Sequence, residues 1–289
     1  MGPESIAPMS AIRGSRFFGM KRTDQHEGLC RFFAPDLRPG TIRLPAAEAH
    51  HAVNVLRLKP GAAAELFDGR GRTAVGTIAQ SRRGEAAVTV ERVEGPADRP
   101  EPVVHLAFAV PKGKRLDWLL EKATELGAAS LHPVVFERSV AGGEELSAGK
   151  RDRWLGHCIA AAKQCGLNFL PEIRDPVGCA ALFAAHQTRR DGTPPRPCQS
   201  SGVQQTAMHA LRLVGDLGAD AAPVAEALAR RQAGQEVLIL IGPEGGLTQE
   251  ERVVVLRAGF IPVRLGGTTL RIETAAIALL AATVAMGAR

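Results

Sequence analysis

The sequence predicts a two-domain α/β protein in which a small β-barrel precedes a larger domain built on a mostly parallel sheet. The chain has 289 residues, and a typical domain size of about 100 to 200 residues favours two units. Its first third contains short apolar segments separated by turns, whereas apolar strands alternate with helical periodicity beyond residue 103. With 45% hydrophobic and 23% charged residues, the chain has the composition of a globular protein that buries a core.

The expected barrel spans residues 31–98 and combines five strands with one helix. Strands are predicted at residues 31–33, 41–44, 64–67, 73–78 and 87–93. The segment Asp68-Gly69-Arg70-Gly71 between two of them is typical of a β-hairpin. A helix is predicted over residues 46–58, followed by the turn Lys59-Pro60-Gly61. Short strands at this spacing favour a small β-barrel.

Three segments are expected to lie outside the two cores. Residues 1–30 lack the apolar core of a signal peptide and are predicted to form a flexible leader. Residues 95–100 are rich in Gly, Pro and charge and mark the domain boundary, so the second domain is expected over residues 101–289. Residues 186–207 within that domain are predicted to be a flexible insertion.

The second domain is predicted to alternate strands with helices. Strands are expected at residues 103–110, 131–136, 211–214, 237–241 and 260–265. Apolar residues at helical spacing predict one helix that closes at Gly127 and another that ends at Gly166. A third helix follows Thr248 and Glu251, which form a capping box, and an Ala-rich helix is expected over residues 275–286. Such alternation predicts a parallel sheet covered on both faces.

Charge and cysteine content limit the possible functions. The net charge of +6 and a pI near 9.4 are compatible with a polyanionic partner such as RNA, although charge alone does not establish one. No apolar run approaches the roughly 20 residues that span a bilayer, which excludes a membrane-spanning protein. The five cysteines include no C-x-x-C pair and no His at zinc-ligand spacing. We therefore expect no metal, and reduced thiols in a cytoplasmic protein.

Two glycine-rich loops form the candidate ligand site. Gly242-Pro243-Glu244-Gly245-Gly246 follows one buried strand, and Gly266-Gly267 follows another. Open α/β sheets bind ligands at the carboxyl ends of their strands, where glycines let the backbone approach a ligand closely. A plain strand-to-helix turn would also explain the first loop. Because neither loop matches G-x-G-x-x-G or a P-loop, dinucleotide and ATP sites are disfavoured.

Charged residues beside these elements are candidates for catalysis and RNA binding. Arg271 and Glu273, next to a helix start, could serve a reaction or could cap the helix and pair with each other. Five cations near element ends could contact phosphates or form a solvated face: Arg57, Lys59, Lys112, Lys114 and Arg115. The pair His50-His51 has no third ligand nearby, so a structural or surface role is expected. Trp118 is expected in the core.

Several motifs, in order along the chain, resemble the RsmE family of bacterial 16S rRNA uridine N3-methyltransferases, which belongs to the SPOUT superfamily. The resemblance covers about residues 31–289. Its motifs are Val55-Leu56-Arg57, Pro60-Gly61, Leu66-Phe67-Asp68-Gly69, Lys114-Arg115-Leu116-Asp117-Trp118, Glu121-Lys122-Ala123-Thr124-Glu125-Leu126-Gly127, Gln164-Cys165-Gly166, Ile241-Gly242-Pro243-Glu244-Gly245-Gly246, Leu270-Arg271 and Glu273-Thr274-Ala275.

The resemblance implies a PUA-like barrel followed by a SPOUT domain whose last segments form a trefoil knot. It also implies a cytoplasmic homodimer that uses S-adenosyl-L-methionine and acts on 16S rRNA or the small ribosomal subunit. Three loops, at residues 213–215, 241–246 and 265–270, would hold the cofactor. Their residues here are Leu213, Val214, Gly215, Ile241, Gly242, Pro243, Glu244, Gly245, Gly246, Leu265, Gly266 and Leu270.

Methylation of uracil N3 requires that its proton be removed and the resulting anion be favoured. Arg271 is the candidate to donate to the uracil oxygen where negative charge gathers. Glu273 is expected to orient Arg271 rather than act as a base, because a carboxylate with a pKa of about 4.3 is a weak base at neutral pH.

Four residues depart from the family pattern and keep alternatives open. They are Leu167, which stands where the family usually has Arg, and Thr268, Thr269 and Ile272. The departures permit a related SPOUT methyltransferase that acts on another RNA position. A non-catalytic RNA-binding protein of ribosome assembly is a further alternative, against which the intact glycine loop with Arg271 and Glu273 argues.

Overall fold

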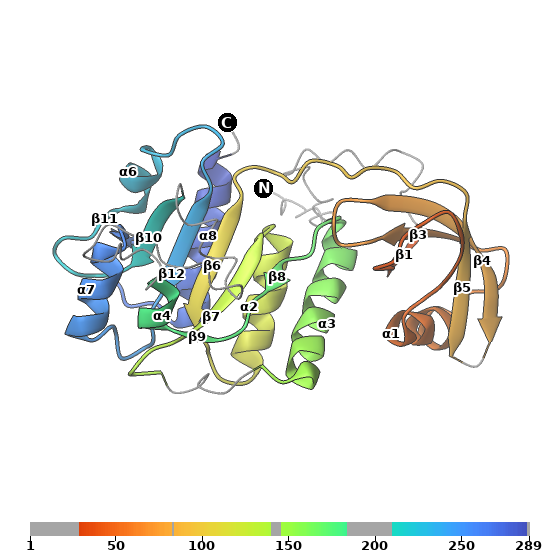
Figure 1. The fold of residues 1–289 in the computed structure, drawn as a ribbon, viewed down its shortest axis with the longest axis horizontal. Coiled ribbons are helices and arrows are strands. Elements are labelled where there is room, and N and C mark those ends of the chain that lie inside the picture. Colours follow the sequence, from red (N-terminus) through yellow and green to blue (C-terminus); the bar gives the residue numbers. More distant parts are fainter. Residues whose placement is uncertain (1–28, 83, 140–145, 184–209, 288–289) are drawn as a thin grey trace, which may run out of the picture.

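The computed structural model of this protein describes residues 29–82, 84–139, 146–183 and 210–287. It contains two sheets, each packed around a hydrophobic core of its own (Figure 1). The mixed α/β class predicted from the sequence is confirmed. Residues 1–28 of the expected leader and the expected insertion at residues 186–207 lie outside the described residues.

The N-terminal sheet contains five strands in the order β1-β3-β4-β5-β2. Their bounds are β1 Cys30–Phe33, β2 Gly40–Arg43, β3 Ala63–Phe67, β4 Thr73–Arg82 and β5 Glu85–Val90. The predicted hairpin joins β3 to β4, with Phe67 opposite Thr73. Asp68 organises this turn, because its Oδ1 accepts hydrogen bonds from the backbone N–H groups of Arg70 and Arg72 at 2.7 and 3.0 Å.

One short helix packs on this sheet and ends earlier than the sequence suggested. Helix α1, Ala46–His50, continues into a π-helical turn, His51–Val55. The prediction extended the helix to residue 58. Arg57 interrupts it because its φ of 53° lies in the left-handed region, which a right-handed helix cannot accommodate.

The C-terminal sheet contains eight strands, all paired in parallel, as predicted. Its order is β11-β13-β10-β12-β6-β7-β8, and β9 pairs with β7. The longer strands are β6 Val104–Ala109, β7 Ser130–Val135, β10 Leu211–Gly215, β12 Val237–Ile241 and β13 Ile261–Arg264. Strands β8 Glu172–Ile173, β9 Val177–Gly178 and β11 Ala222–Pro223 have two residues each. Segments this short carry no periodicity from which they could be predicted.

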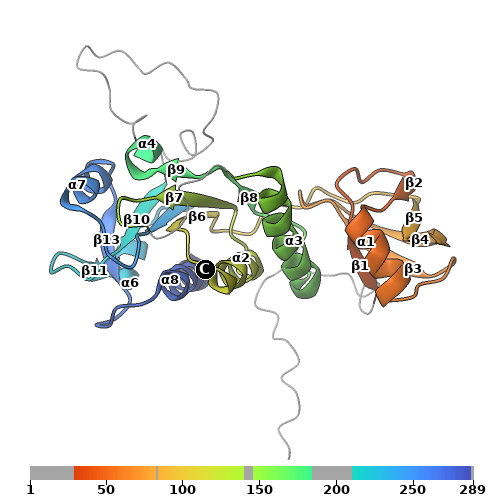
Figure 2. The same cartoon turned by 90° about the horizontal axis from the view of Figure 1, so that it is seen from below.

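Helices cover both faces of this sheet. Figure 2 shows α2, α3 and α8 on one face and α4 and α7 on the other. The bounds are α2 Lys114–Glu125, α3 Ala148–Cys165, α4 Cys179–Phe183, α6 Val224–Leu228, α7 Gln249–Arg257 and α8 Ile272–Gly287. Gly166 ends α3 with a φ of 81°, as predicted. Among the described helices, none has the length and apolarity needed to cross a bilayer.

The two units are joined through buried charged side chains. Lys163 of α3 donates to both carboxylate oxygens of Glu48 in α1, at 2.9 and 3.1 Å. Arg31 of β1 donates to the carbonyl of Leu167 at 3.0 Å and lies 3.7 Å from Glu65, and the side chains of Arg31 and Glu65 are 3% exposed. Buried charges are tolerated only when they are paired in this way. Leu167, a departure from the family pattern, therefore lies at the contact between the units.

A second buried polar network lies where β6 and β7 begin. The Ser130 hydroxyl is 2.6 Å from Nδ1 of His105 and 2.5 Å from Nε2 of His132, and His105 also contacts Glu236 at 3.2 Å. Burial lowers the pKa of His132 to about 3, and the nearby charges of His105 and Arg174 act in the same direction. Burial likewise lowers the pKa of His105.

We expect Lys163→Ala to lower the free energy of unfolding by about 3 kcal/mol, because Glu48 would remain buried without its cation. Urea unfolding followed by tryptophan fluorescence measures this change. Lys122→Ala is the matched control, since Lys122 and Glu125 form a more exposed pair on one helix and their loss costs at most about 1 kcal/mol. Equal effects of the two substitutions would contradict the role assigned to Lys163.

We also expect the stability to fall as the pH drops below 6.5. Over that range His132 takes up a proton in the unfolded chain but stays neutral in the fold until about pH 3. The wild-type free energy of unfolding should decrease between pH 6.5 and 5 by up to about 2 kcal/mol more than that of His132→Gln. Urea titrations across this pH range provide the measurement, and parallel curves for the two proteins would refute the expectation.

Candidate functional site

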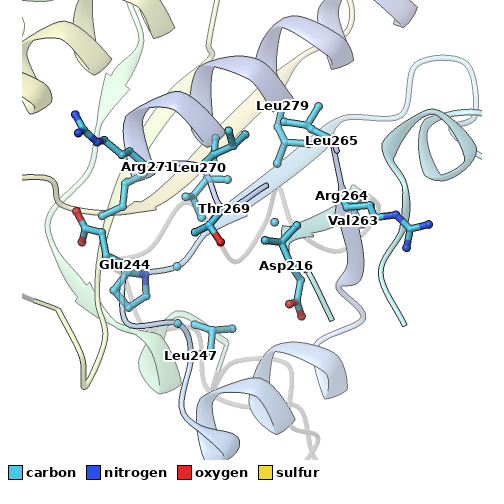
Figure 3. A pocket seen from close by; sticks show the side chains of 18 of the residues that line it. Asp216, Glu244, Leu247, Val263, Arg264, Leu265, Thr269, Leu270, Arg271 and Leu279 are labelled. Atoms are coloured by element: carbon cyan, nitrogen blue, oxygen red, sulfur yellow. The ribbon is translucent and has the colours of Figure 1, made fainter. Parts of the chain in front are cut away.

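A cavity lies at the carboxyl ends of β10, β12 and β13 (Figure 3). The parallel registers place Val214 opposite Leu240 and Gly215 opposite Val263, so these three strands end side by side. The cavity has a volume of about 450 Å³, within the range of small-molecule sites. Most of its lining residues come from the loops after the three strands, within residues 215–217, 241–247 and 263–272.

The first glycine loop is held at both ends. It begins at β12, whose five residues are all buried, and it ends at the N-terminus of α7. There the predicted capping box is confirmed. Thr248 Oγ1 accepts from the N–H of Glu251 at 3.2 Å, and Glu251 Oε2 accepts from the N–H of Thr248 at 2.9 Å. Within the loop, a Cβ at Gly242 would lie 3.2 Å from Cδ2 of Leu247, so the backbone fits closely there.

The structure brings nine of the residues predicted for cofactor binding to the cavity wall. They are Gly215, Ile241, Gly242, Pro243, Glu244, Gly246, Leu265, Gly266 and Leu270. Leu213, Val214 and Gly245 do not line it, and their part in cofactor binding stays a prediction. Leu213 and Val214 are buried within β10, and Gly245 faces Arg138, whose Cβ would lie 3.3 Å from a Cβ built at that glycine.

Several lining residues were not predicted, and Asp216 is the most informative of them. It follows β10 directly, and Figure 3 shows it across the cavity from Arg271 and Glu244. Its carboxylate accepts hydrogen bonds from the backbone N–H of Gly218 at 2.9 Å and from Arg252, which also binds Asp220. Partial burial raises the pKa of Asp216, but these donors outweigh it and keep the pKa below its usual value. Its position at a strand end was the available signal. Thr268 and Thr269 also line the cavity, within the third predicted loop. The other unpredicted lining residues are Leu217, Leu247, Arg252, Val263, Arg264, Ile272, Ala275 and Leu279.

The two candidate catalytic residues occupy different environments. Arg271 is exposed at the cavity wall. Glu273 is 7% exposed in the first turn of α8, does not line the cavity, and has one carboxylate oxygen, Oε2, without a hydrogen-bond partner among the described residues. Helix α8 starts three residues before the predicted helix, which is why Glu273 lies inside it.

The predicted RNA-binding cations fall into two separate groups. Arg57 and Lys59 are exposed on the N-terminal unit, after the π-helical turn. Lys112 and Lys114 are exposed beside the start of α2, and Arg115 lies 3.4 Å from Glu244 of the glycine loop. The structure thus brings Arg115 of the second group, but neither residue of the first, to a residue that lines the cavity.

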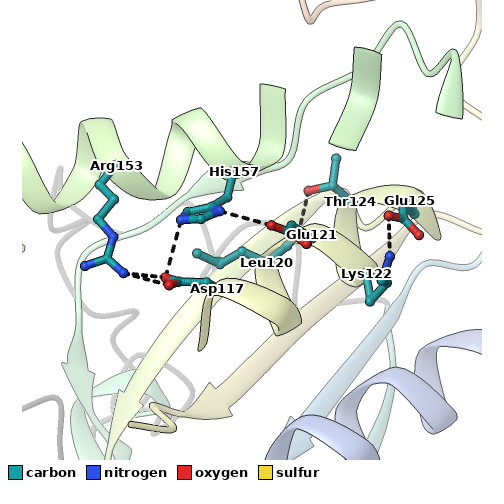
Figure 4. Close-up of polar contacts among 8 residues, drawn as sticks. All are labelled: Asp117, Leu120, Glu121, Lys122, Thr124, Glu125, Arg153 and His157. Atoms are coloured by element: carbon teal, nitrogen blue, oxygen red, sulfur yellow. Dashed lines mark hydrogen bonds and ion pairs between the residues drawn. The ribbon is translucent and has the colours of Figure 1, made fainter. Parts of the chain in front are cut away.

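Trp118 was expected in the core, and this expectation is wrong because its side chain is 43% exposed. Helix α2 buries Leu116, Leu119 and Leu120, and Trp118 falls on the opposite face. Asp117 and Glu121 of the same helix bind His157 of α3, as Figure 4 shows.

The histidine pair where α1 meets the π-helical turn makes structural contacts. His50 contacts Asn54 at 2.8 Å, and His51 contacts Lys163 at 3.1 Å. Burial and the charge of Lys163 lower the pKa of His51. Within the described ranges, no three His, Cys, Asp or Glu side chains gather as a metal site would require.

Comparison with known proteins defines the class to which this fold and cavity belong. Residues 99–284 match a family model described as an RNA methyltransferase domain, and residues 44–91 match one described as an RNA methyltransferase PUA domain. The protein is therefore a two-domain RNA methyltransferase with an N-terminal PUA domain.

Related proteins identify the family. The ribosomal RNA small subunit methyltransferase E of Mycobacterium bovis is 33% identical over 247 residues, which is 81% of this chain and 82% of the relative. That of Bacillus subtilis is 29% identical over 245 residues, 84% of this chain and 89% of the relative. The Neisseria gonorrhoeae enzyme, crystallised with S-adenosyl methionine, superimposes with a TM-score of 0.69 and 28% identity, covering 88% of this chain and 96% of the other.

The chain belongs to the ribosomal RNA small subunit methyltransferase E family. The predicted resemblance, the enzyme class and the use of S-adenosyl-L-methionine are thereby confirmed. The non-catalytic alternative is set aside. The trefoil knot stays a prediction.

We expect Gly242→Trp to abolish binding of S-adenosyl-L-methionine, because an indole at this position would collide with Leu247 and fill the cavity. Isothermal titration calorimetry measures the loss. Gly149→Trp on α3 is the control, because a Cβ there meets no atom within 4 Å and the residue is exposed. Unchanged affinity in Gly242→Trp would show that the cofactor binds elsewhere.

Proposed function

We propose that this protein methylates N3 of a uridine in 16S rRNA, either free or within the small ribosomal subunit, as a cytoplasmic homodimer. The observation that carries the proposal is the exposed Arg271 on the wall of the cavity, directly after the predicted cofactor loop that ends at Leu270, in a member of a family of small-subunit rRNA methyltransferases. Lys112, Lys114 and Arg115 lie at the same end of the domain and provide positive charge for RNA.

The residues of the cavity fit S-adenosyl-L-methionine in size and chemistry. Leu247, Leu265 and Leu279 supply apolar surface for an adenine, and backbone groups of the two glycine loops are accessible for its polar atoms. The ionised carboxylate of Asp216 can accept hydrogen bonds from hydroxyl or ammonium groups. The bound cofactor supplies the electrophilic methyl group.

Arg271 favours the chemical step by stabilising the uracil anion. Loss of the N3 proton spreads negative charge onto the neighbouring carbonyl oxygens, and a guanidinium can donate to one of them with its planar fork. The side chain is exposed at the cavity wall, so an incoming base can reach it. The cavity wall also restricts the direction from which uracil N3 approaches the methyl group of the cofactor, which reduces the entropic cost of aligning the two reactants.

Glu273 acts through position rather than as a base. Its side chain is buried in α8 and does not line the cavity, so a uracil proton does not reach it directly. It lies two residues after Arg271, at the first turn of the helix, where a carboxylate stabilises the helix N-terminus. We assign it the role of holding the start of α8, and hence Arg271, in place.

A second candidate is methylation at another position of the rRNA. Thr268 and Thr269, two departures from the family pattern, both line the cavity. Their hydroxyl groups could select a different base edge at the target.

We expect the wild-type protein to form N3-methyluridine in small subunits isolated from cells that lack it, and mass spectrometry of the digested rRNA detects the product. Arg271→Ala should lower kcat by about 10²- to 10³-fold, as the loss of a donor to a developing oxyanion does, with little change in cofactor affinity. Glu273→Gln should lower kcat less and leave the pH profile unchanged.

Three outcomes would overturn parts of this proposal. A different methylated nucleoside in the product would favour the second candidate. An Arg271→Ala enzyme with unchanged kcat would remove Arg271 from the mechanism. A Glu273→Gln enzyme that loses the acidic limb of its pH profile would make Glu273 the base.

A further inference from the structure

The segment that follows β7 contacts the glycine loop from outside the cavity. Arg138 Nη1 donates to the carbonyl of Gly245 at 2.9 Å, and the backbone N–H of Glu137 donates to Glu251 Oε1 at 2.7 Å. Glu251 also closes the capping box at the end of the same loop. Residues 137 and 138 therefore hold the outer side of the loop whose inner side lines the cavity.

Arg115 reaches the same loop from the start of α2. Its Nη1 lies 3.4 Å from Glu244 Oε1, and both side chains are more than 40% exposed. A single, long and exposed ion pair contributes little free energy. Arg115 can therefore exchange Glu244 for another anion at small cost.

Among the residues that the structure describes, Arg138 has donors to spare while it holds the loop. A guanidinium has five N–H donors in a fixed fork, and Gly245 takes one of them. The residue is exposed, and the structure shows no partner for its other donors among the described residues. Arg115 and Arg138 thus contact two adjacent residues of one loop, Glu244 and Gly245, and both can bind an external anion.

The surroundings of these two arginines carry excess positive charge. Lys112, Lys114 and Arg271 are exposed and form no ion pair with any residue that the structure describes. The carboxylates of Glu137, Glu244 and Glu251 offset only part of this charge. A polyanion is the partner that such a surface favours.

We propose that Arg115 and Arg138 bind a phosphate of the substrate RNA, and that Arg138 couples this contact to cofactor binding through the carbonyl of Gly245. The inference rests on the proposed function and adds to it a positioning residue, Arg138, and a linkage between the two ligands. Neither motif nor charge pattern singled out Arg138, which becomes significant only through its contact with the loop.

The coupling follows from the shared loop. A cofactor in the cavity fixes residues 242–246 from the inside, which fixes the Gly245 carbonyl and with it the direction of the Arg138 fork. An RNA phosphate then meets a guanidinium that is already ordered, so its binding costs less conformational entropy. Because coupling between two binding sites is reciprocal, RNA must tighten the cofactor by the same factor.

The test measures RNA affinity with and without a cofactor that does not react. Small ribosomal subunits are isolated from cells that lack the protein. A filter-binding assay then gives the dissociation constant of the wild-type protein for these subunits, without and with saturating S-adenosylhomocysteine. We expect the wild type to bind at least about fivefold more tightly with S-adenosylhomocysteine, the lower end of typical allosteric coupling. Arg138→Ala should bind RNA more weakly, and its RNA affinity should be the same with and without S-adenosylhomocysteine.

Two further variants separate coupling from charge. Arg138→Lys keeps the charge but lacks the planar fork, so it should restore part of the RNA affinity without the coupling. Arg230→Ala removes an exposed arginine just after α6 that does not line the cavity. It should leave unchanged both the RNA affinity and the increase of that affinity with S-adenosylhomocysteine. Calorimetry with S-adenosylhomocysteine alone shows that each variant still forms the cofactor site.

The outcomes distinguish this inference from the function on which it rests. The coupling would be overturned if the wild-type protein binds cofactor and methylates rRNA but has the same RNA affinity with and without S-adenosylhomocysteine. The role of Arg138 would be overturned if Arg138→Ala keeps both the wild-type RNA affinity and the wild-type gain in that affinity on adding S-adenosylhomocysteine. A wild type that neither binds S-adenosylhomocysteine nor methylates would overturn the proposed function itself.

Discussion

Parallel pairing of β10 with both β12 and β13 is the constraint on which the site depends. Strands β12 and β13 flank β10 and run in the same direction, so the loops that follow all three leave the sheet at one edge. Residues far apart in the chain, such as Asp216, Gly242 and Arg271, therefore line one cavity. A single antiparallel strand among the three would have sent one loop to the opposite edge. The glycines then let these crowded loops approach one another and the ligand.

Much of this arrangement could be predicted because it is local in the sequence. The buried strand 237–241, the glycine loop after it and the capping box of Thr248 and Glu251 are consecutive, and each follows from short-range rules. The same holds for the helix ends at Gly127 and Gly166. Only the resemblance to a family connected these segments to a particular cofactor.

The residues that were missed depend on contacts between distant segments. Arg138 precedes Gly245 by 107 positions and reaches it only because β7 lies two strands from β12. Asp216 and Arg252 are likewise distant in the sequence, and they form a hydrogen bond only because the fold brings the end of β10 close to α7. Trp118 shows the opposite error. An aromatic residue beside a helical apolar pattern was expected in the core, but the buried face of α2 is satisfied by smaller residues, and the indole remains exposed.

The buried contact between the two units has a consequence for how a large substrate is selected. Lys163, Glu48, Arg31 and Glu65 leave little room for the PUA domain to rotate on α3, because any rotation would expose or separate paired charges. The span from the exposed Arg57 and Lys59 to the cavity is therefore set when the chain folds. If Arg57 and Lys59 bind RNA as predicted, an RNA that reaches both places has to present them at that spacing, and the rigid contact between the units would then select substrates by their shape.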